Sequence, residues 1–141
     1  MTENKYEQYL IRNPWIVGIN PEVLEPIINF EGEKAGDGVN FTLSRSWITQ
    51  PFTMIKEPHE HDFDQILFFL GGNPLDVKEF EAEVEFYMGD KQEKYIITTP
   101  TVIHVPIGLS HGPLNFRRID KPIEFLDIFL APKYIRKPNP E

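Results

Sequence analysis

The chain has 141 residues, contains no cysteine and carries a formal net charge of −8 at pH 7. Its length is that of one ordinary domain. The absence of thiols excludes disulfides and thiolate ligands, so any metal site must use nitrogen and oxygen donors. The negative charge repels nucleic-acid phosphates and anionic membrane surfaces, and we therefore expect neither nucleic acid nor a membrane as a partner.

The N-terminal stretch, residues 1–40, lacks the regular strand pattern of the rest of the chain. The run ENKYEQYLI is compatible with a short helix, and PEVLEPIINFEGEKAGDG is typical of an irregular arm that ends in a loop. There is no signal-peptide pattern, and no apolar run approaches the roughly 20 residues that a membrane helix needs. We expect a cytoplasmic protein whose N-terminal arm packs on the main domain or on a partner subunit.

The middle of the chain consists of short apolar runs separated by turns rich in proline and glycine. The clearest run is FEAEVEFYMG, in which apolar residues alternate with glutamates in the period of two that is typical of a half-buried strand. Weaker runs of the same kind are VNFTLSRSWI, FTMIK, DQILFFL, KYIITT, TVIHVP, LNFRRI and IEFLDIFL. About eight strands with turns between them predict an antiparallel sandwich or barrel.

The segment PHEHDFDQ places His59 and His61 one residue apart. Residues two apart on a strand face the same side, so both imidazoles can converge on one ion. Gln65 shares this parity, but a straight strand would carry it about 13 Å beyond His61. It can join the site only if the chain bends at Asp62–Asp64, where aspartates tolerate a turn. The alternative is a pair of surface histidines with no role.

A third histidine follows in the segment PIGLSHGPLN. Pro106 and Gly108 predict a turn, and His111 comes at the start of the next apolar run. A neighbouring strand that begins here can bring His111 to the first two imidazoles. Three of the four histidines then share one purpose.

These two segments resemble the two motifs of the cupin family, small jelly-roll proteins with a metal site inside the barrel. The first motif corresponds to His59, His61, Gln65 and Gly72, and the second to Pro106, Gly108, His111 and Asn115. The resemblance covers residues 41–132. It implies an all-β, antiparallel double-stranded β-helix (a cupin jelly-roll barrel) with little helix, preceded by the arm and followed by a mobile C-terminal tail over residues 133–141.

The resemblance also implies one divalent transition metal held by His59, His61, His111 and Gln65. Thr53 and Pro100 replace the glycines that open the two family motifs, which affects turn geometry. Gln65 stands where the family usually has glutamate, and a neutral amide is a weaker ligand that leaves the charge of the ion less compensated. Either the ion is held less tightly and is a stronger Lewis acid, or this position is not a ligand. Iron, nickel, zinc, manganese and copper all suit such a donor set.

Four further residues are candidates for lining a substrate site: Phe63, His104, Arg117 and Asp127. His104, in TVIHVP, is more typical of a packed or surface histidine than of a fourth metal ligand. By strand parity either Arg117 or Arg118 should point inward, where it could clamp a carboxylate, although a solvated arginine is the commoner outcome. Asp127 lies among apolar residues and is either a general base or a paired core group.

Two functions fit these features. The first is an enzyme acting on a small organic molecule, in which the metal either activates dioxygen, as in a dioxygenase, or polarises the substrate for lyase, decarboxylase or isomerase chemistry. The alternative is a module that binds or senses a metal or small ligand without turnover. In either case we expect a small-molecule ligand and a homodimer formed through an edge strand or an exchanged arm.

Overall fold

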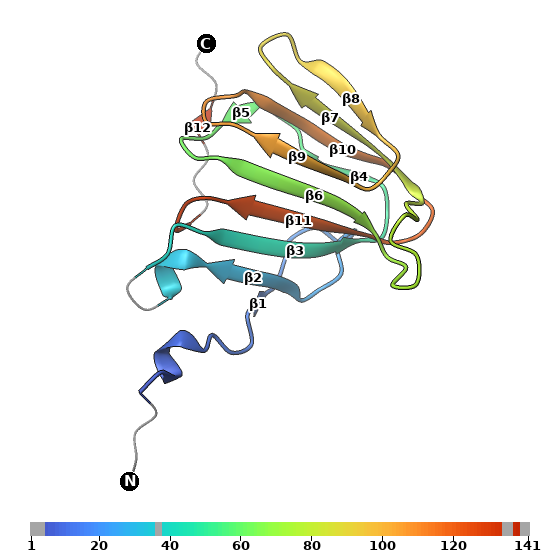
Figure 1. The fold of residues 1–141 in the computed structure, drawn as a ribbon. Coiled ribbons are helices and arrows are strands. Elements are labelled where there is room, and N and C mark those ends of the chain that lie inside the picture. The colour runs from blue at the N-terminus through green and yellow to red at the C-terminus, as the bar shows by residue number, and fades with distance from the viewer. Residues whose placement is uncertain (1–4, 36–37, 134–136, 139–141) are drawn as a thin grey trace.

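The computed structural model describes residues 5–35, 38–133 and 137–138, and these form two antiparallel sheets that face each other (Figure 1). The first sheet has the order β1 (Trp15–Ile16), β2 (Ile27–Glu31), β3 (Thr42–Ile48), β11 (Ile123–Phe129), β6 (Gln65–Gly71) and β9 (Thr101–Val105). The second has the order β12 (Lys137–Pro138), β5 (His59–Glu60), β10 (His111–Ile119), β7 (Ala82–Met88) and β8 (Glu93–Ile97), with β4 (Phe52–Ile55) also paired to β10.

The expected all-β architecture is confirmed. Among the described strands no pairing joins the two sheets, so the molecule is a jelly-roll sandwich rather than a fully closed barrel. Helix in the described residues is limited to two short 3₁₀ turns, η1 (Glu7–Tyr9) and η2 (Gly32–Lys34). No described helix has the length and apolar character that a membrane crossing requires.

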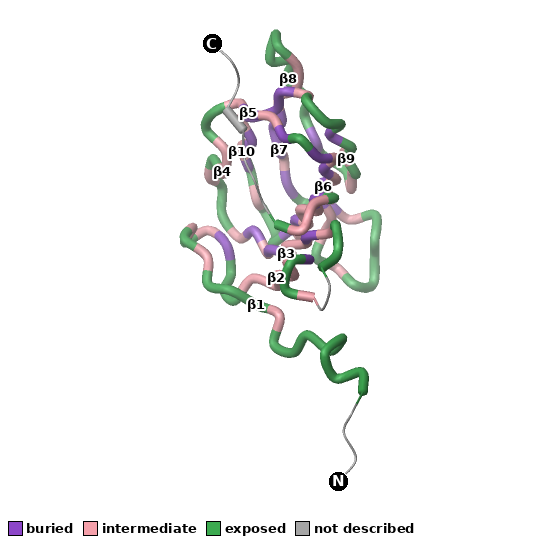
Figure 2. The backbone as a smooth tube through the Cα atoms, turned by 90° about the vertical axis from the view of Figure 1, so that its left-hand side faces the viewer, coloured by how far each residue is buried: buried purple, intermediate pink, exposed green. Residues whose placement is uncertain are grey.

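The core lies between the sheets and follows from the alternation read in the sequence. On β7 the side chains of Ala82, Val84 and Phe86 are buried, and Figure 2 shows the buried segments along the inside of both sheets. Rings from facing strands meet there, with Phe116 5.7 Å from Phe125 between centroids. Such edge-on aromatic contacts add to the stabilisation from buried apolar area.

The N-terminal region is more regular than the sequence predicted. Strand β2, in the stretch expected to be irregular, pairs with β3 and extends the first sheet, and the two-residue β1 pairs with β2 at the sheet edge. Pairing with a neighbouring strand supplies the backbone hydrogen bonds that local sequence pattern does not reveal. Residues 5–14, before β1, lead away from the sheets and are mostly exposed (Figures 1 and 2).

At the other end of the chain, the backbone of β12 pairs with β5, so that Pro138 is opposite His59. Residues 134–136 and 139–141 lie outside the described residues, and the predicted mobility of the tail rests largely on them.

Candidate metal centre

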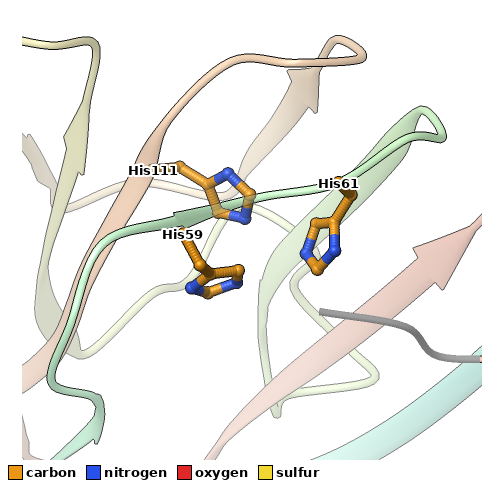
Figure 3. A group of neighbouring side chains, drawn as sticks. All are labelled: His59, His61 and His111. Carbon is orange, nitrogen blue, oxygen red and sulfur yellow. The ribbon is translucent and has the colours of Figure 1, made fainter. Parts of the chain in front are cut away.

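Three histidine side chains lie close together (Figure 3). His111 is the antiparallel partner of His59 across the β5–β10 pair, and His61 comes from the segment just after β5. The ring centroids are 4.4 Å apart for His59 and His111, 4.8 Å for His59 and His61, and 5.1 Å for His61 and His111. One nitrogen of each ring lies within 4.8 Å of those of the other two.

All three side chains are buried, with 4%, 2% and 3% of their surface exposed for His59, His61 and His111. One nitrogen from each of three buried imidazoles is thus brought to one place, and the cluster is a candidate donor set for a metal ion.

Two of the rings are oriented by backbone carbonyls. Nδ1 of His59 lies 3.3 Å from the carbonyl oxygen of Glu57, and Nδ1 of His111 lies 2.9 Å from that of Leu109. Because a carbonyl only accepts, Nδ1 carries the hydrogen and Nε2 keeps its lone pair in the neutral ring. This is the usual way in which a metal-binding histidine is held in one tautomer. The sequence did not identify these partners.

The chain bends between His61 and Gln65, as it must if Gln65 is to lie near the histidines. Strand β5 contains only His59–Glu60, the chain bends at Asp62 and Phe63, and β6 then begins at Gln65 in the opposite sheet. The turn of the second motif is tied to this segment, since the Gly108 N–H donates to the carbonyl oxygen of His61 over 2.9 Å. The positive φ of Gly108, 77°, is a conformation that glycine adopts without strain.

Gln65 reaches the same interior from the first sheet. It lines a small cavity, about 30 Å³ in volume, together with His59, His111 and Asp127. Its Nε2 donates to Oδ1 of Asp127 over 2.6 Å. Its Oε1 is buried and has no hydrogen-bond partner among the described residues, an arrangement that is costly unless something else binds there. Metal ligation by Gln65 stays a prediction.

Asp127 occupies the interior position that its apolar surroundings suggested. Burial raises the pKa of its carboxyl to about 7, and the hydrogen bond from Gln65 opposes this rise. Asp127 carries the only carboxyl among the described residues that line the cavity. An acid at this place was anticipated, but its contact with Gln65 was not.

Phe63 lies directly beside the cluster. Its ring stacks on His61 with centroids 4.6 Å apart and planes 15° from parallel, and it also contacts Phe129 at 5.5 Å. Phe63 is buried. It therefore holds His61 in place and keeps water from one side of it.

His104 does not join the other histidines. It lies on β9 with 62% of its side chain exposed, on the face opposite the buried Val105, and its Nε2 is 2.7 Å from Oδ1 of Asp64. The inclusion of His104 among the substrate-lining candidates is wrong, because strand alternation turns it outward.

The expectation that Arg117 or Arg118 points inward is also wrong. Arg117 pairs with Glu85 at 2.8 Å and with Glu83 at 3.3 Å on the outer face of the second sheet, and it holds the pKa of Glu85 below its ordinary value. Arg118 pairs with Asp120 and is also exposed. The β10–β7 register shifts between Phe116 and Arg118, so a β-bulge breaks the parity on which the expectation depended.

No protein-family model and no curated protein matches the chain. Several solved structures do. An oxalate decarboxylase from Lactobacillus farciminis with bound formate is 15% identical to this chain, with a TM-score of 0.60. The match covers 89% of this chain and 34% of the decarboxylase chain. A mutant oxalate decarboxylase from Bacillus subtilis is 13% identical to this chain, with a TM-score of 0.56, and the match covers 86% of this chain and 29% of the decarboxylase chain. Vicilin from hazelnut, Corylus avellana, is 16% identical to this chain, with a TM-score of 0.55, and the match covers 88% of this chain and 33% of the vicilin chain.

The chain has the cupin fold. It spans about a third of the length of each of these three chains. At such low identity the likeness shows the fold alone, and the fold is shared by an oxalate decarboxylase and a vicilin with similar scores. The function of this chain must therefore be argued from its own site.

Proposed function

We propose that this cupin is a metal-dependent enzyme that binds one divalent transition ion through His59, His61 and His111 and acts on a small organic molecule. The observation that carries the proposal is the buried three-histidine cluster, whose ring nitrogens lie within 4.8 Å of one another. Nitrogen ligands about 2.0–2.1 Å from a common ion lie roughly 3–3.5 Å apart. The three nitrogens must therefore approach one another by up to about 1–2 Å when an ion binds.

The donor set supports a transition ion but does not select one. Imidazole suits iron, nickel, copper and zinc, and an added oxygen donor from Gln65 also accommodates manganese. When bound, such an ion supplies Lewis acidity and open positions for an oxygen-donor substrate. The chain itself orients His59 and His111 through the carbonyls of Glu57 and Leu109.

The size of the interior supports a small substrate. The cavity beside His59 and His111 has a volume of about 30 Å³, whereas pockets for drug-sized ligands begin at roughly 300 Å³. Such a space holds about one or two water molecules, so it admits one end of a small molecule, such as a carboxylate group. Two of the similar structures are enzymes named for oxalate, and a small carboxylate is the substrate class that we propose first.

The alternative is a module that binds a metal or small ligand without turnover. One observation favours it: Arg117 and His104 face away from the cluster. Among the described residues that line the cavity, only Asp127 carries an acidic group, and most of the others are apolar. Few groups are thus in place to move protons.

Single-turnover assays separate the two functions. Metal-loaded protein is mixed with small carboxylates, diketones and catechols, with and without dioxygen, and substrate loss and ligand binding are both recorded. The enzyme proposal expects turnover by the wild type and by His104→Ala but none by His61→Ala. A need for dioxygen would indicate a dioxygenase, and turnover without it a lyase, decarboxylase or isomerase. Ligand binding without loss of any substrate would support the binding module instead.

We also propose that the protein forms a homodimer through its N-terminal region. Large apolar side chains are exposed along residues 6–24: Tyr6, Tyr9, Leu10, Ile11, Trp15, Ile16, Val17, Ile19 and Leu24. Apolar surface of this kind favours burial against a partner. Light scattering at micromolar concentration is expected to give twice the mass of one chain, and a monomer mass would contradict the proposal.

A further inference from the structure

We infer that Asp127 is a positioning residue that aims the carbonyl oxygen of Gln65 at the metal ion, so that the Gln65–Asp127 pair replaces a single carboxylate ligand. The inference rests on the proposed metal site. It concerns a contact between two strands that are far apart in the sequence, and it assigns a role to the buried oxygen of Gln65.

The register of the first sheet brings the two residues together. In the β6–β11 pair Gln65 is opposite Phe129, and Asp127 is opposite Leu67. Gln65 and Asp127 are therefore diagonal neighbours on one face of the sheet, within reach of each other's side chains. They face the interior, since both line the cavity that His59 and His111 also line.

The hydrogen bond fixes which end of the amide faces the histidines. Oδ1 of Asp127 accepts a hydrogen bond from the NH₂ group of Gln65, at 2.6 Å, and both an ionised carboxylate and the carbonyl oxygen of a neutral carboxyl can accept in this way. The carbonyl oxygen Oε1 is then turned away from Asp127. It is buried without a hydrogen-bond partner among the described residues. This is the arrangement expected of an oxygen atom that ligates a metal ion.

The pair also supplies the charge that glutamine lacks. A neutral amide bound to a divalent ion leaves that charge uncompensated. A bound cation favours the ionised form of a neighbouring carboxyl, and the negative charge of Asp127 then lies in the same cavity as the ion. A carboxylate that accepts a hydrogen bond from a ligand also increases the electron density on the ligating atom, as carboxylates do behind metal-bound histidines.

Two other roles for Asp127 make different predictions. A purely structural pair would lower the stability of the metal-free protein when broken but leave metal affinity unchanged. An acid or base in the reaction would change turnover without changing affinity. A positioning role changes affinity, and it does so only while Gln65 is present.

The first test is a double-mutant cycle on metal affinity. Co²⁺ dissociation constants are measured by chelator competition, and the Co²⁺ absorption spectrum is recorded, for wild type, Gln65→Ala, Asp127→Ala and the double variant. Losing such a supporting partner typically weakens metal binding about 10–100-fold, and we expect this for both single variants. The double variant should be no weaker than Gln65→Ala, because Asp127 acts through Gln65. Unchanged affinity in Asp127→Ala, or losses that multiply, would overturn the inference.

A matched control and a conservative variant accompany the cycle. Glu124 lies on the same strand, three residues before Asp127, and pairs with Arg45 at 3.6 Å instead of facing the cavity; Glu124→Ala should leave affinity unchanged. Asp127→Asn keeps an acceptor but loses the charge, so its affinity should fall between those of wild type and Asp127→Ala. If Asp127→Ala does not fold, the metal affinity of Asp127→Asn takes its place in the cycle.

A charge swap gives the sharpest comparison. Gln65→Glu combined with Asp127→Asn moves the negative charge from the second residue to the first, and an Asn amide can donate to the new carboxylate. We expect affinity at least equal to that of wild type. Affinity no better than that of Asp127→Asn alone would contradict the inference. If instead wild type binds no ion, or His61→Ala binds it as tightly, the metal site itself fails, and the inference fails with it.

Discussion

His111 is the direct antiparallel neighbour of His59, and their rings lie 4.4 Å apart. This relationship joins two segments that are distant in sequence, and each histidine is oriented by a carbonyl two residues before it. The geometry of the centre therefore depends on the short β5–β10 pairing and on the turns that lead into it.

Gly112 directly follows His111 and lies close to β4 and to the segment that leads into β5. Its φ is +98°, and an added Cβ would lie 3.1 Å from Cγ2 of Ile55 and 3.2 Å from the carbonyl oxygen of Glu57, the acceptor for His59. We predict that Gly112→Ala destabilises the protein by about 1–3 kcal/mol through backbone strain alone and weakens metal binding by displacing both histidines. Chemical denaturation and Co²⁺ titration measure the two effects.

Gly89 provides the matched control for Gly112. Its φ is +88°, but no atom lies within 4 Å of an added Cβ. Gly89→Ala should show the cost of backbone strain without the loss of metal affinity. Equal metal affinities for both variants would contradict a role of Gly112 in the site.

Phe63 is expected to support His61 by packing. Removing the buried ring in Phe63→Ala should lower the free energy of unfolding by about 3–5 kcal/mol and weaken metal binding, because His61 loses the ring on which it stacks. Phe63→Leu should cost less in both measurements. Phe52→Ala breaks another stacked pair, with Phe116 at 5.5 Å, and should reduce stability without changing metal affinity. A similar loss of affinity in Phe52→Ala would indicate a general effect of destabilisation.

The raised pKa of Asp127 predicts how stability varies with pH in the metal-free protein. The carboxyl ionises near 3.8 when unfolded but near 7 when folded, so between these values the folded state binds more protons. The free energy of unfolding therefore falls as pH rises from about 4 to 7 and stays lower above that. One pKa unit corresponds to about 1.4 kcal/mol, which limits the effect to a few kcal/mol.

Asp127→Asn removes this titration. The free energy of unfolding of Asp127→Asn, relative to that of wild type, should increase as the pH is raised from 4 to 7.5. Urea denaturation in the presence of a chelator measures both values. Every other residue is the same in both proteins, so the difference between the two curves isolates Asp127. Curves that run parallel over this range would show that the buried carboxyl does not titrate as proposed.

Metal affinity should also depend on pH. Imidazole binds an ion only when neutral, and its ordinary pKa is about 6.5. We expect the apparent affinity for Co²⁺ or Zn²⁺ to weaken progressively as pH falls from 8 to 5. A constant affinity over this interval would contradict ligation by histidine.

The parts of the fold that were predictable follow a strict period of two. Strand β7 shows it, with Ala82, Val84 and Phe86 buried and glutamates between them. The three-histidine cluster was predictable because motif spacing specifies which residues meet. Gln65 can reach the histidines only if the chain bends before it, and the aspartates at positions 62 and 64 favour such a bend.

What the sequence could not provide depends on tertiary pairing. A bulge near Arg117 turned both arginines outward, and a one-residue insertion in a ladder leaves no clear signal in one sequence. Strand β2 is extended because its backbone pairs with β3 in the first sheet, and its own sequence does not show this. The contact between Gln65 and Asp127 depends on the register of β6 and β11, which the sequence does not fix.

The most direct test of the account is the number of ions bound per chain, measured by Co²⁺ titration followed by absorption and elemental analysis. The account predicts one ion per chain for wild type and for His104→Ala, whose side chain is exposed and pairs with Asp64. It predicts no stoichiometric binding for His59→Ala, His61→Ala or His111→Ala, provided that each remains folded by circular dichroism. Equal metal content in all four folded variants would contradict the three-histidine centre.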